Sequence, residues 1–228
     1  MLVVSSWLCF VACAGAQGTG DRFLLFSGTD FWRQGSFLHG GVLWSPGGLD
    51  NEGFALKALI SAGSYTYLSD TLGQVRGREL VAQLMPGWHF KFNHIEFRAF
   101  AGLDLENHRL SPDDPDGGLR GNDLGLRAAF ELWSEPTPNI MVAADGSIST
   151  IDHNYSFRAA TGWRVADLFY LGPEVQAYAN DGYMQRRVGI HFTAFRFNGV
   201  EWSAAGGFAR DSDHRNSAYV RLSISRRR

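Results

Sequence analysis

Cysteine is nearly absent from the 228-residue sequence, and both copies, Cys9 and Cys13, fall within the first sixteen residues. If that segment is removed on export, the mature chain has no thiol, which excludes disulfide bonds and thiol catalysis. Charge is also scarce, since charged residues make up 19% and the formal net charge is −2. Nucleic-acid binding needs a concentrated basic surface, so this balance argues against a nucleic-acid partner.

Beyond the N-terminus, the sequence has no long apolar run and no segment of helical length with sustained 3.6-residue periodicity. Glycine and aromatic residues are plentiful instead, with 27 glycines and 14% Phe, Trp and Tyr. This mixture is typical of short strands, tight turns and aromatic packing.

The first sixteen residues are predicted to be a secretory signal, followed by a single domain over residues 17–228. Residues 2–14 are apolar and small, Ala14-Gly15-Ala16 fits the small-x-small cleavage pattern, and the run is too short to span a bilayer as a helix. No Lys or Arg precedes the run. A buried N-terminal strand is one alternative. A lipid anchor on Cys13 is another, although Phe10 stands where a lipoprotein signal usually has Leu.

Period-two alternation predicts an all-β fold. Apolar residues from Ile95 to Leu105 alternate with charged residues from Glu96 to Glu106, and similar patterns occupy residues 124–132, 155–165 and 220–224. The turns between such runs divide the chain into about twelve strands, at residues 22–33, 36–45, 53–68, 78–92, 94–107, 123–133, 139–150, 154–165, 169–180, 184–197, 200–211 and 216–226. An even count is the rule for bacterial outer-membrane barrels, so we predict an antiparallel up-and-down β-barrel of the outer-membrane type.

Two patterns favour a membrane barrel over a soluble one. With the N-terminus in the periplasm, most of the longer or more polar connections lie on the extracellular side, namely residues 69–77, 110–122 and 212–216. Tight turns on the periplasmic side are made by residues 93–94, 166–168 and 198–199. Two connections are exceptions: residues 45–52 form a long connection on the periplasmic side, and the first hairpin is tight although it lies on the extracellular side.

Aromatic residues at both sets of strand ends are the second pattern, and they predict two interfacial girdles. At the periplasmic strand ends the aromatic residues are Phe23, Trp44, Phe54, Phe90, Phe92, Trp133, Trp163, Phe169, Phe195, Phe197 and Trp202. At the opposite, extracellular strand ends they are Tyr65, Tyr67, Tyr155, Tyr183 and Tyr219. The C-terminal Arg226-Arg227-Arg228 departs from the aromatic ending that is common in such barrels.

Sites for catalysis, cofactors or metals are not expected. His153 with Ser156, and His214 with Ser212, resemble parts of a hydrolase site, but neither pair has an obvious carboxylate nearby on the same face. The acidic stretch from Asp113 to Asp116 lacks the bidentate Glu of a calcium loop and is typical of a turn. The seven histidines show no paired metal spacing.

Charged residues on the polar faces are predicted to share one lumen. They are Glu96, Arg98, Glu106, Arg127, Glu131, Arg158, Arg164, Glu174 and Glu201. Opposite charges on neighbouring strands favour a salt network in a plugged or narrow barrel, and a conducting pore is the alternative.

A family resemblance rests on Phe26-Ser27-Gly28-Thr29-Asp30-Phe31-Trp32, on Gly40-Gly41-Val42-Leu43-Trp44-Ser45-Pro46, on Gly48-Leu49-Asp50, and on Gly53-Phe54-Ala55-Leu56-Lys57 with Tyr65-Thr66-Tyr67. These segments resemble the N-terminal half of the BcsS family of bacterial cellulose biosynthesis proteins. Gly87-Trp88 and Leu171-Gly172-Pro173-Glu174 fit less distinctively. The motifs are glycines and aromatics, so the resemblance carries over no catalytic residue.

The resemblance implies a non-enzymatic accessory barrel in cellulose biosynthesis or export, hence exopolysaccharide secretion and biofilm formation. Its expected partners are the cellulose synthase and export machinery and the lipids of the outer membrane. Possible lumen or glucan contacts are Glu96, Arg98, Arg127, Glu131, Arg158 and Glu174. Two alternatives are an outer-membrane enzyme that modifies lipid or polysaccharide, and a soluble periplasmic barrel that binds a ligand.

Overall fold

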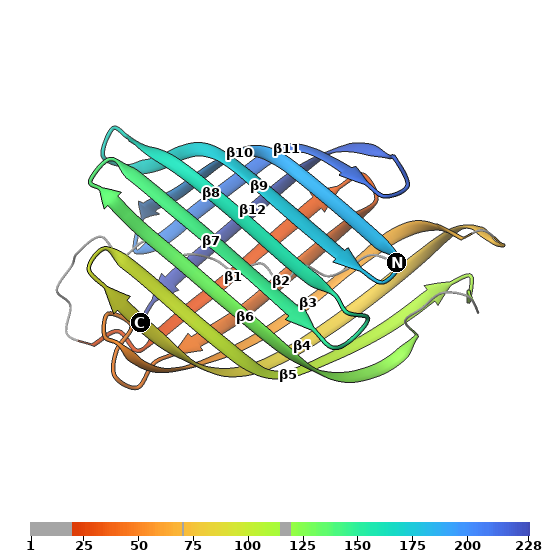
Figure 1. Cartoon of the computed structure of the whole chain (residues 1–228), viewed down its shortest axis with the longest axis horizontal. Helices are drawn as coiled ribbons and strands as arrows, with labels where there is room; N and C mark the ends of the chain where they lie inside the picture. The colour runs from red at the N-terminus through yellow and green to blue at the C-terminus, as the bar shows by residue number, and fades with distance from the viewer. Residues whose placement is uncertain (1–19, 70, 115–119) are drawn as a thin grey trace.

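The computed structural model describes residues 20–69, 71–114 and 120–228. The predicted signal segment and Asp116 lie outside these residues. The described chain forms twelve strands and no helix (Figure 1): β1 (Phe23–Trp32), β2 (Gly35–Trp44), β3 (Gly53–Ser69), β4 (Gly73–Phe92), β5 (Ile95–Ser111), β6 (Gly121–Thr137), β7 (Ile140–Ser149), β8 (Tyr155–Val165), β9 (Phe169–Asn180), β10 (Tyr183–Phe197), β11 (Val200–Asp211) and β12 (Asn216–Arg227). It therefore holds no helix long and apolar enough to cross a membrane.

Each strand pairs antiparallel with its neighbours in sequence, and β1 pairs with β12 to close the barrel. This confirms the predicted up-and-down barrel of twelve strands. At the β6–β7 turn, β6 continues to Thr137 instead of residue 133. The other large differences in the strand ends are at two hairpins, where β4 begins at Gly73 instead of residue 78 and β5 continues to Ser111 instead of residue 107. The ladder continues there, for example in the pair of Ser69 with Gly73, although the sequence is polar. As a result, the β3–β4 and β5–β6 hairpins extend beyond the other strands (Figure 1).

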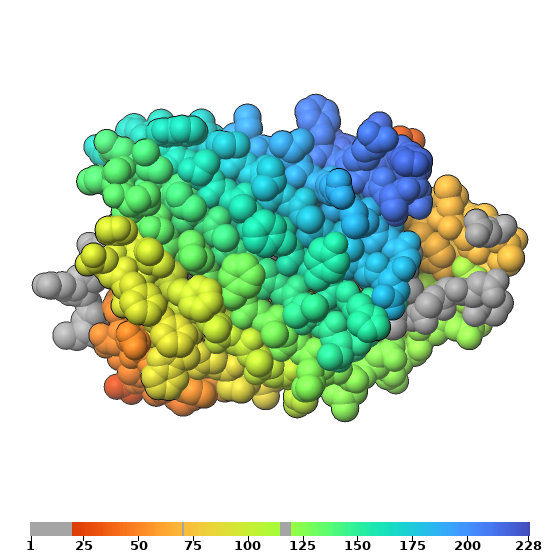
Figure 2. Space-filling view, in the orientation of Figure 1, coloured from red at the N-terminus to blue at the C-terminus, as the bar shows by residue number. Residues whose placement is uncertain are grey.

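The wall has its apolar side chains outside and its polar side chains inside, the reverse of a water-soluble barrel. Leu103, Leu124 and Trp163 are exposed, whereas the strand neighbours of opposite parity, such as Asp104 and Arg127, are buried. This confirms the predicted facing of the strands and matches the alternation of transmembrane barrels. In the space-filling view, side chains of neighbouring strands cover this wall continuously (Figure 2).

The aromatic girdle is present at the end of the barrel where Phe23 and Arg227 lie, which we call the terminal end. Six aromatic side chains of the set predicted for the periplasmic strand ends are exposed there: Phe23, Phe54, Phe92, Trp163, Phe197 and Trp202. Trp133, by contrast, is buried in the interior, so its assignment to the girdle is wrong.

The predicted girdle of tyrosines at the opposite, distal end is also wrong for four of its five members. Tyr65, Tyr67, Tyr183 and Tyr219 are buried, and Tyr155 alone of the five is exposed. The reason is the alternation of side chains along a strand. Tyr219 lies two residues before Arg221 on β12, and both side chains therefore point into the barrel.

The terminal end has short turns. Asn198 and Gly199 connect β10 to β11 with φ angles of 51° and 73°, as a type I′ turn requires, and these are conformations that Asn and Gly adopt readily. The long connection at residues 45–52 is anchored by Leu49, which is buried and packs in one cluster with Leu24 and Leu43.

Candidate functional site in the barrel interior

The six predicted lumen residues all lie on the inner side of the wall. Glu96 and Arg98 are on β5, Arg127 and Glu131 on β6, Arg158 on β8 and Glu174 on β9. All but Glu96 are buried, and the Glu96 side chain keeps 16% exposure near the terminal end. The structure distributes them over three groups of ion pairs.

The first group lies toward the terminal end. Glu131 accepts hydrogen bonds from Lys57 Nζ at 2.8 Å and from Arg98 Nη1 at 3.3 Å. Arg98 also lies 3.5 Å from Glu96, whose other oxygen is 3.1 Å from Lys91 Nζ. Since Lys57 is on β3 and Glu131 on β6, this pair reaches across part of the lumen and does not merely link adjacent strands.

The second group is centred on Arg127 in the distal half. Its guanidinium donates to Asp104 Oδ2 from Nε at 2.8 Å and to Glu106 Oε1 from Nη2 at 3.3 Å. Ser147 and Asn154 accept two further hydrogen bonds from the same group. All of the guanidinium nitrogens are therefore engaged within the wall.

The third group surrounds Glu174. Its Oε2 atom lies 2.7 Å from Arg221 Nη2 and 3.8 Å from Arg158 Nη1, and its Oε1 atom accepts a hydrogen bond from Tyr219 Oη at 2.9 Å. Arg158 also donates to Asp145 at 3.0 Å. Glu174 on β9 and Arg221 on β12 are separated by two strands, so this pair too reaches across part of the lumen.

Asp30 and Arg187 form a further buried pair that the sequence analysis did not include. Both Asp30 oxygens accept from Arg187 Nη1, at 2.8 and 3.0 Å. The guanidinium carbon lies 4.9 Å from the ring centre of Trp32, and two tyrosine rings stand at 5.0 Å. This surround of rings adds cation–π attraction to the ion pair.

These ion pairs lie in the interior, and three of them join strands that are not neighbours in the sheet. The predicted salt network is thus confirmed. Such pairs are a structural constraint as well, since loss of one partner leaves the other charged and buried.

A cavity of about 570 Å³ opens at the terminal end, beside Glu96. Trp133 lines it and donates from Nε1 to Glu135 Oε1 at 3.3 Å. Arg164 lies 3.4 Å from Glu135 Oε2 and hydrogen-bonds to the hydroxyl of Tyr170, whose ring packs against its guanidinium. A neighbouring cavity of about 190 Å³ shares Glu135 and Arg164. We call this region the terminal cavity; it combines aromatic rings with charged hydrogen-bonding groups.

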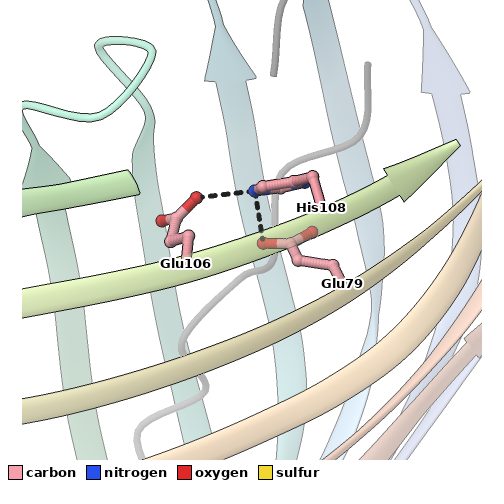
Figure 3. Close-up of side chains that lie close together, drawn as sticks. All are labelled: Glu79, Glu106 and His108. Atoms are coloured by element: carbon pink, nitrogen blue, oxygen red, sulfur yellow. Dashed lines mark hydrogen bonds and ion pairs between the residues drawn. The ribbon is translucent and has the colours of Figure 1, made fainter. Parts of the chain in front are cut away.

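The sequence analysis did not predict one cluster of two carboxylates and an imidazole. Glu79 on β4 and Glu106 and His108 on β5 lie together in the distal half, and all three are buried (Figure 3). His108 Nε2 is 3.0 Å from Glu106 Oε2 and 3.8 Å from Glu79 Oε1. The Glu-x-His spacing places both side chains on one face of a strand, a usable signal, but the predicted strand ended at residue 107 and excluded His108.

The two His–Ser pairs that resemble parts of a hydrolase site do not form such a cluster. The Ser156 hydroxyl lies 2.9 Å from Ser147 Oγ. His153 does have a carboxylate partner, Asp181 at 3.0 Å, contrary to the expectation from sequence, because the β7–β8 and β9–β10 connections are neighbours at the distal end. This ion pair is exposed. Asp114, from the predicted turn, accepts a hydrogen bond from Tyr67 Oη at 2.9 Å.

Comparison with solved structures places the fold among outer-membrane barrels. The KdgM porin has a TM-score of 0.52 with 12% identity, over 89% of this chain and 98% of the porin, and a second structure holds that porin in complex with disordered oligogalacturonate. An outer-membrane channel from Pseudomonas putida F1 has a TM-score of 0.53 with 10% identity, over 93% of this chain and 97% of the channel. The translocator domain of the autotransporter NalP from Neisseria meningitidis has a TM-score of 0.54 with 12% identity, over 93% and 90% of the two chains.

Sequence comparison gives one family. The profile described as "Cellulose biosynthesis protein BcsS" matches residues 24–228. Among curated protein sequences, none matches this chain.

Proposed function

Because the chain belongs to the BcsS family of cellulose biosynthesis proteins, we propose that it is a non-enzymatic accessory barrel of the outer membrane that receives β-glucan at its terminal end. The observation that carries this proposal is the combination of an apolar outer wall with a polar interior that opens into the terminal cavity. The wall suits a lipid bilayer. The terminal end, with its short turns, then faces the periplasm, where a newly made polymer arrives.

The terminal cavity has the chemistry that a neutral glucan requires. Trp133 and Tyr170 are buried with their rings 6.0 Å apart, and they form the apolar backing of the polar groups that line this cavity. Glu135 and Arg164 supply an acceptor and donors for sugar hydroxyls. The KdgM porin in complex with disordered oligogalacturonate supports the idea that a barrel of this fold can contact a sugar oligomer.

The six predicted contacts divide into two roles under this proposal. Glu96 borders the terminal cavity and remains partly exposed, so we assign it a direct contact with glucan. The other five, Arg98, Arg127, Glu131, Arg158 and Glu174, are buried in ion pairs that hold the wall together.

Binding to purified protein tests the cavity directly. The barrel in detergent is titrated with cellohexaose while tryptophan fluorescence is recorded. Arg164→Ala and Glu135→Gln should weaken binding at least tenfold, whereas Arg120→Ala, an exposed arginine at the distal end, should bind as the unmodified protein does. Equal binding by all four proteins contradicts the assignment of the terminal cavity.

The cellular role requires a deletion strain. Surface cellulose, measured by dye binding and acid-resistant glucose, should fall, while membranes of the strain should still make glucan from UDP-glucose. Fractionation with heat-modifiable migration should place the protein in the outer membrane. Normal surface cellulose in the deletion strain would remove the delivery role, and lost synthase activity would point to a regulatory partner of the synthase instead.

A further inference from the structure

Glu79, Glu106 and His108 have the geometry of a small metal site. One ligand atom from each lies within 4.8 Å of the others. A zinc ion bound at about 2.0–2.2 Å from each of three ligands holds them about 3.3–3.6 Å apart in tetrahedral geometry. The distances from His108 Nε2, 3.0 Å to Glu106 Oε2 and 3.8 Å to Glu79 Oε1, bracket that spacing.

The surroundings orient Glu106 for this role. Its Oε1 atom accepts hydrogen bonds from Arg127 Nη2 at 3.3 Å and from Asn154 Nδ2 at 3.2 Å. The other oxygen, Oε2, is thereby directed toward His108 (Figure 3). Partners that fix the second oxygen of a carboxylate are a regular feature of metal sites.

Negative charge also gathers here. Arg127 is shared between Asp104 and Glu106, so one guanidinium faces two buried carboxylates, and Glu79 brings a third carboxylate beside His108. Buried carboxylates are costly unless positive charge compensates them. A divalent cation among these groups supplies two positive charges at the point where the carboxylates meet.

The His108 ring can present the required lone pair. Its Nδ1 atom lies 3.5 Å from Tyr65 Oη. When Nδ1 carries the proton and donates it to the tyrosine oxygen, Nε2 is left unprotonated and faces both glutamates. This is the protonation state that coordinates a metal ion.

We infer that Glu79, Glu106 and His108 bind one divalent transition-metal ion, for which Zn²⁺ is the best match. Imidazole with two carboxylates suits zinc, whereas Ca²⁺ takes six to eight oxygen ligands. The ion links β4 to β5 directly, because Glu79 is paired with His108 in the ladder between them. It therefore stiffens the base of the hairpins that extend at the distal end. The competing arrangement is a protonated His108 held between the two carboxylates without a metal.

Metal content decides between these arrangements. The full chain is folded into detergent, stripped with EDTA, dialysed against ZnCl₂, and analysed for bound metal and for binding heat. The unmodified barrel should retain one zinc per chain, and its thermal midpoint should rise with Zn²⁺ more than with Ca²⁺. Absence of stoichiometric zinc, or an equal response to both ions, overturns the inference.

Variants locate the ion. His108→Gln and Glu79→Gln should each lower zinc affinity at least tenfold. The matched control is His89→Gln on β4, since His89 is equally buried but pairs with Glu96 near the terminal end. Heat-modifiable migration of every variant shows which ones fold. Zinc lost from His89→Gln but kept by His108→Gln contradicts the site. If a site variant does not fold, the zinc stoichiometry of the unmodified barrel still decides the question, and neither result bears on glucan binding at the opposite end.

Discussion

The buried pair of Asp30 and Arg187 allows a quantitative test of how much the interior depends on its charges. At an N–O distance of 2.8 Å and an effective dielectric constant of about 20, the attraction between two unit charges is about 6 kcal/mol. Desolvation offsets part of this, and breaking one partner of a buried pair typically costs about 3–5 kcal/mol. We therefore expect Arg187→Leu to lower the free energy of unfolding by about 3–5 kcal/mol.

The measurement is urea unfolding of the barrel in detergent, followed by tryptophan fluorescence and by heat-modifiable migration. Trp32 packs against the guanidinium of Arg187 and reports on this region. The control is Arg120→Leu, which removes a pair of similar length, 3.1 Å to Asp113, whose members are 46% and 77% exposed. Exposed pairs contribute about 0–1 kcal/mol, so this variant should unfold nearly as the unmodified barrel does.

The double variant Asp30→Asn with Arg187→Leu isolates the cause. If the cost of Arg187→Leu comes from a carboxylate left charged in the interior, neutralising Asp30 should recover part of it. The reasoning is refuted if Arg187→Leu costs no more than Arg120→Leu, or if the double variant is less stable than the sum of the two single changes predicts.

Three further predictions concern the wall and its connections. Leu103→Arg should destabilise the barrel in lipid by about 2–4 kcal/mol, because an outward arginine near the bilayer midplane is poorly solvated, whereas Leu103→Ala should cost much less; equal stability of the two in refolding assays would contradict the outward facing of Leu103. Burial, and then the neighbouring Asp181, raise the pKa of Asp152 in the β7–β8 connection to about 6. Since this value lies above the unfolded pKa of about 3.9, the contribution of Asp152 to stability is greatest below pH 4 and falls as the pH rises toward 7, by less than about 1 kcal/mol given solvent screening; from pH 4 to 8 the thermal midpoint of the unmodified barrel should therefore fall relative to that of Asp152→Asn. An epitope inserted in the β5–β6 connection between residues 116 and 117 should be detected on intact cells, while one between residues 198 and 199 should not, and labelling of both or of neither would refute the orientation.

The strands and their facing could be predicted from sequence because one physical signal repeats along every strand. Residues that point into the lumen beside other charges are polar, and the alternate residues that face the lipid are apolar. Strand β5 shows this alternation from Ile95 to Glu106. The strand ends at the distal side could not be predicted in the same way. Residues 73–77 and 107–111 stand beyond the apolar alternation, yet they still pair in ladders with their neighbours.

The site was predicted only in part, for a related reason. Alternation identifies which charges point inward, but it does not fix the height of each residue along the barrel. Register and tilt bring Lys57 to Glu131 and Asp30 to Arg187, and neither partnership leaves a trace in local sequence. The inward tyrosines were predictable in principle, since their parity agrees with that of the charged residues on the same strands.

The seam between β1 and β12 gives folding a fixed order of completion. Leu24 pairs with Arg227, and the carbonyl of Arg228 accepts hydrogen bonds from the backbone N–H groups of Arg22 and Phe23. Partners about 200 residues apart meet at a greater entropic cost than the hairpins do, so we expect the seam to be the last ladder to form. Until then β1 and β12 are two open edges, each a template for pairing with another chain. We therefore expect an intermediate at this stage to aggregate through those edges, and a chaperone for this barrel to act by shielding them.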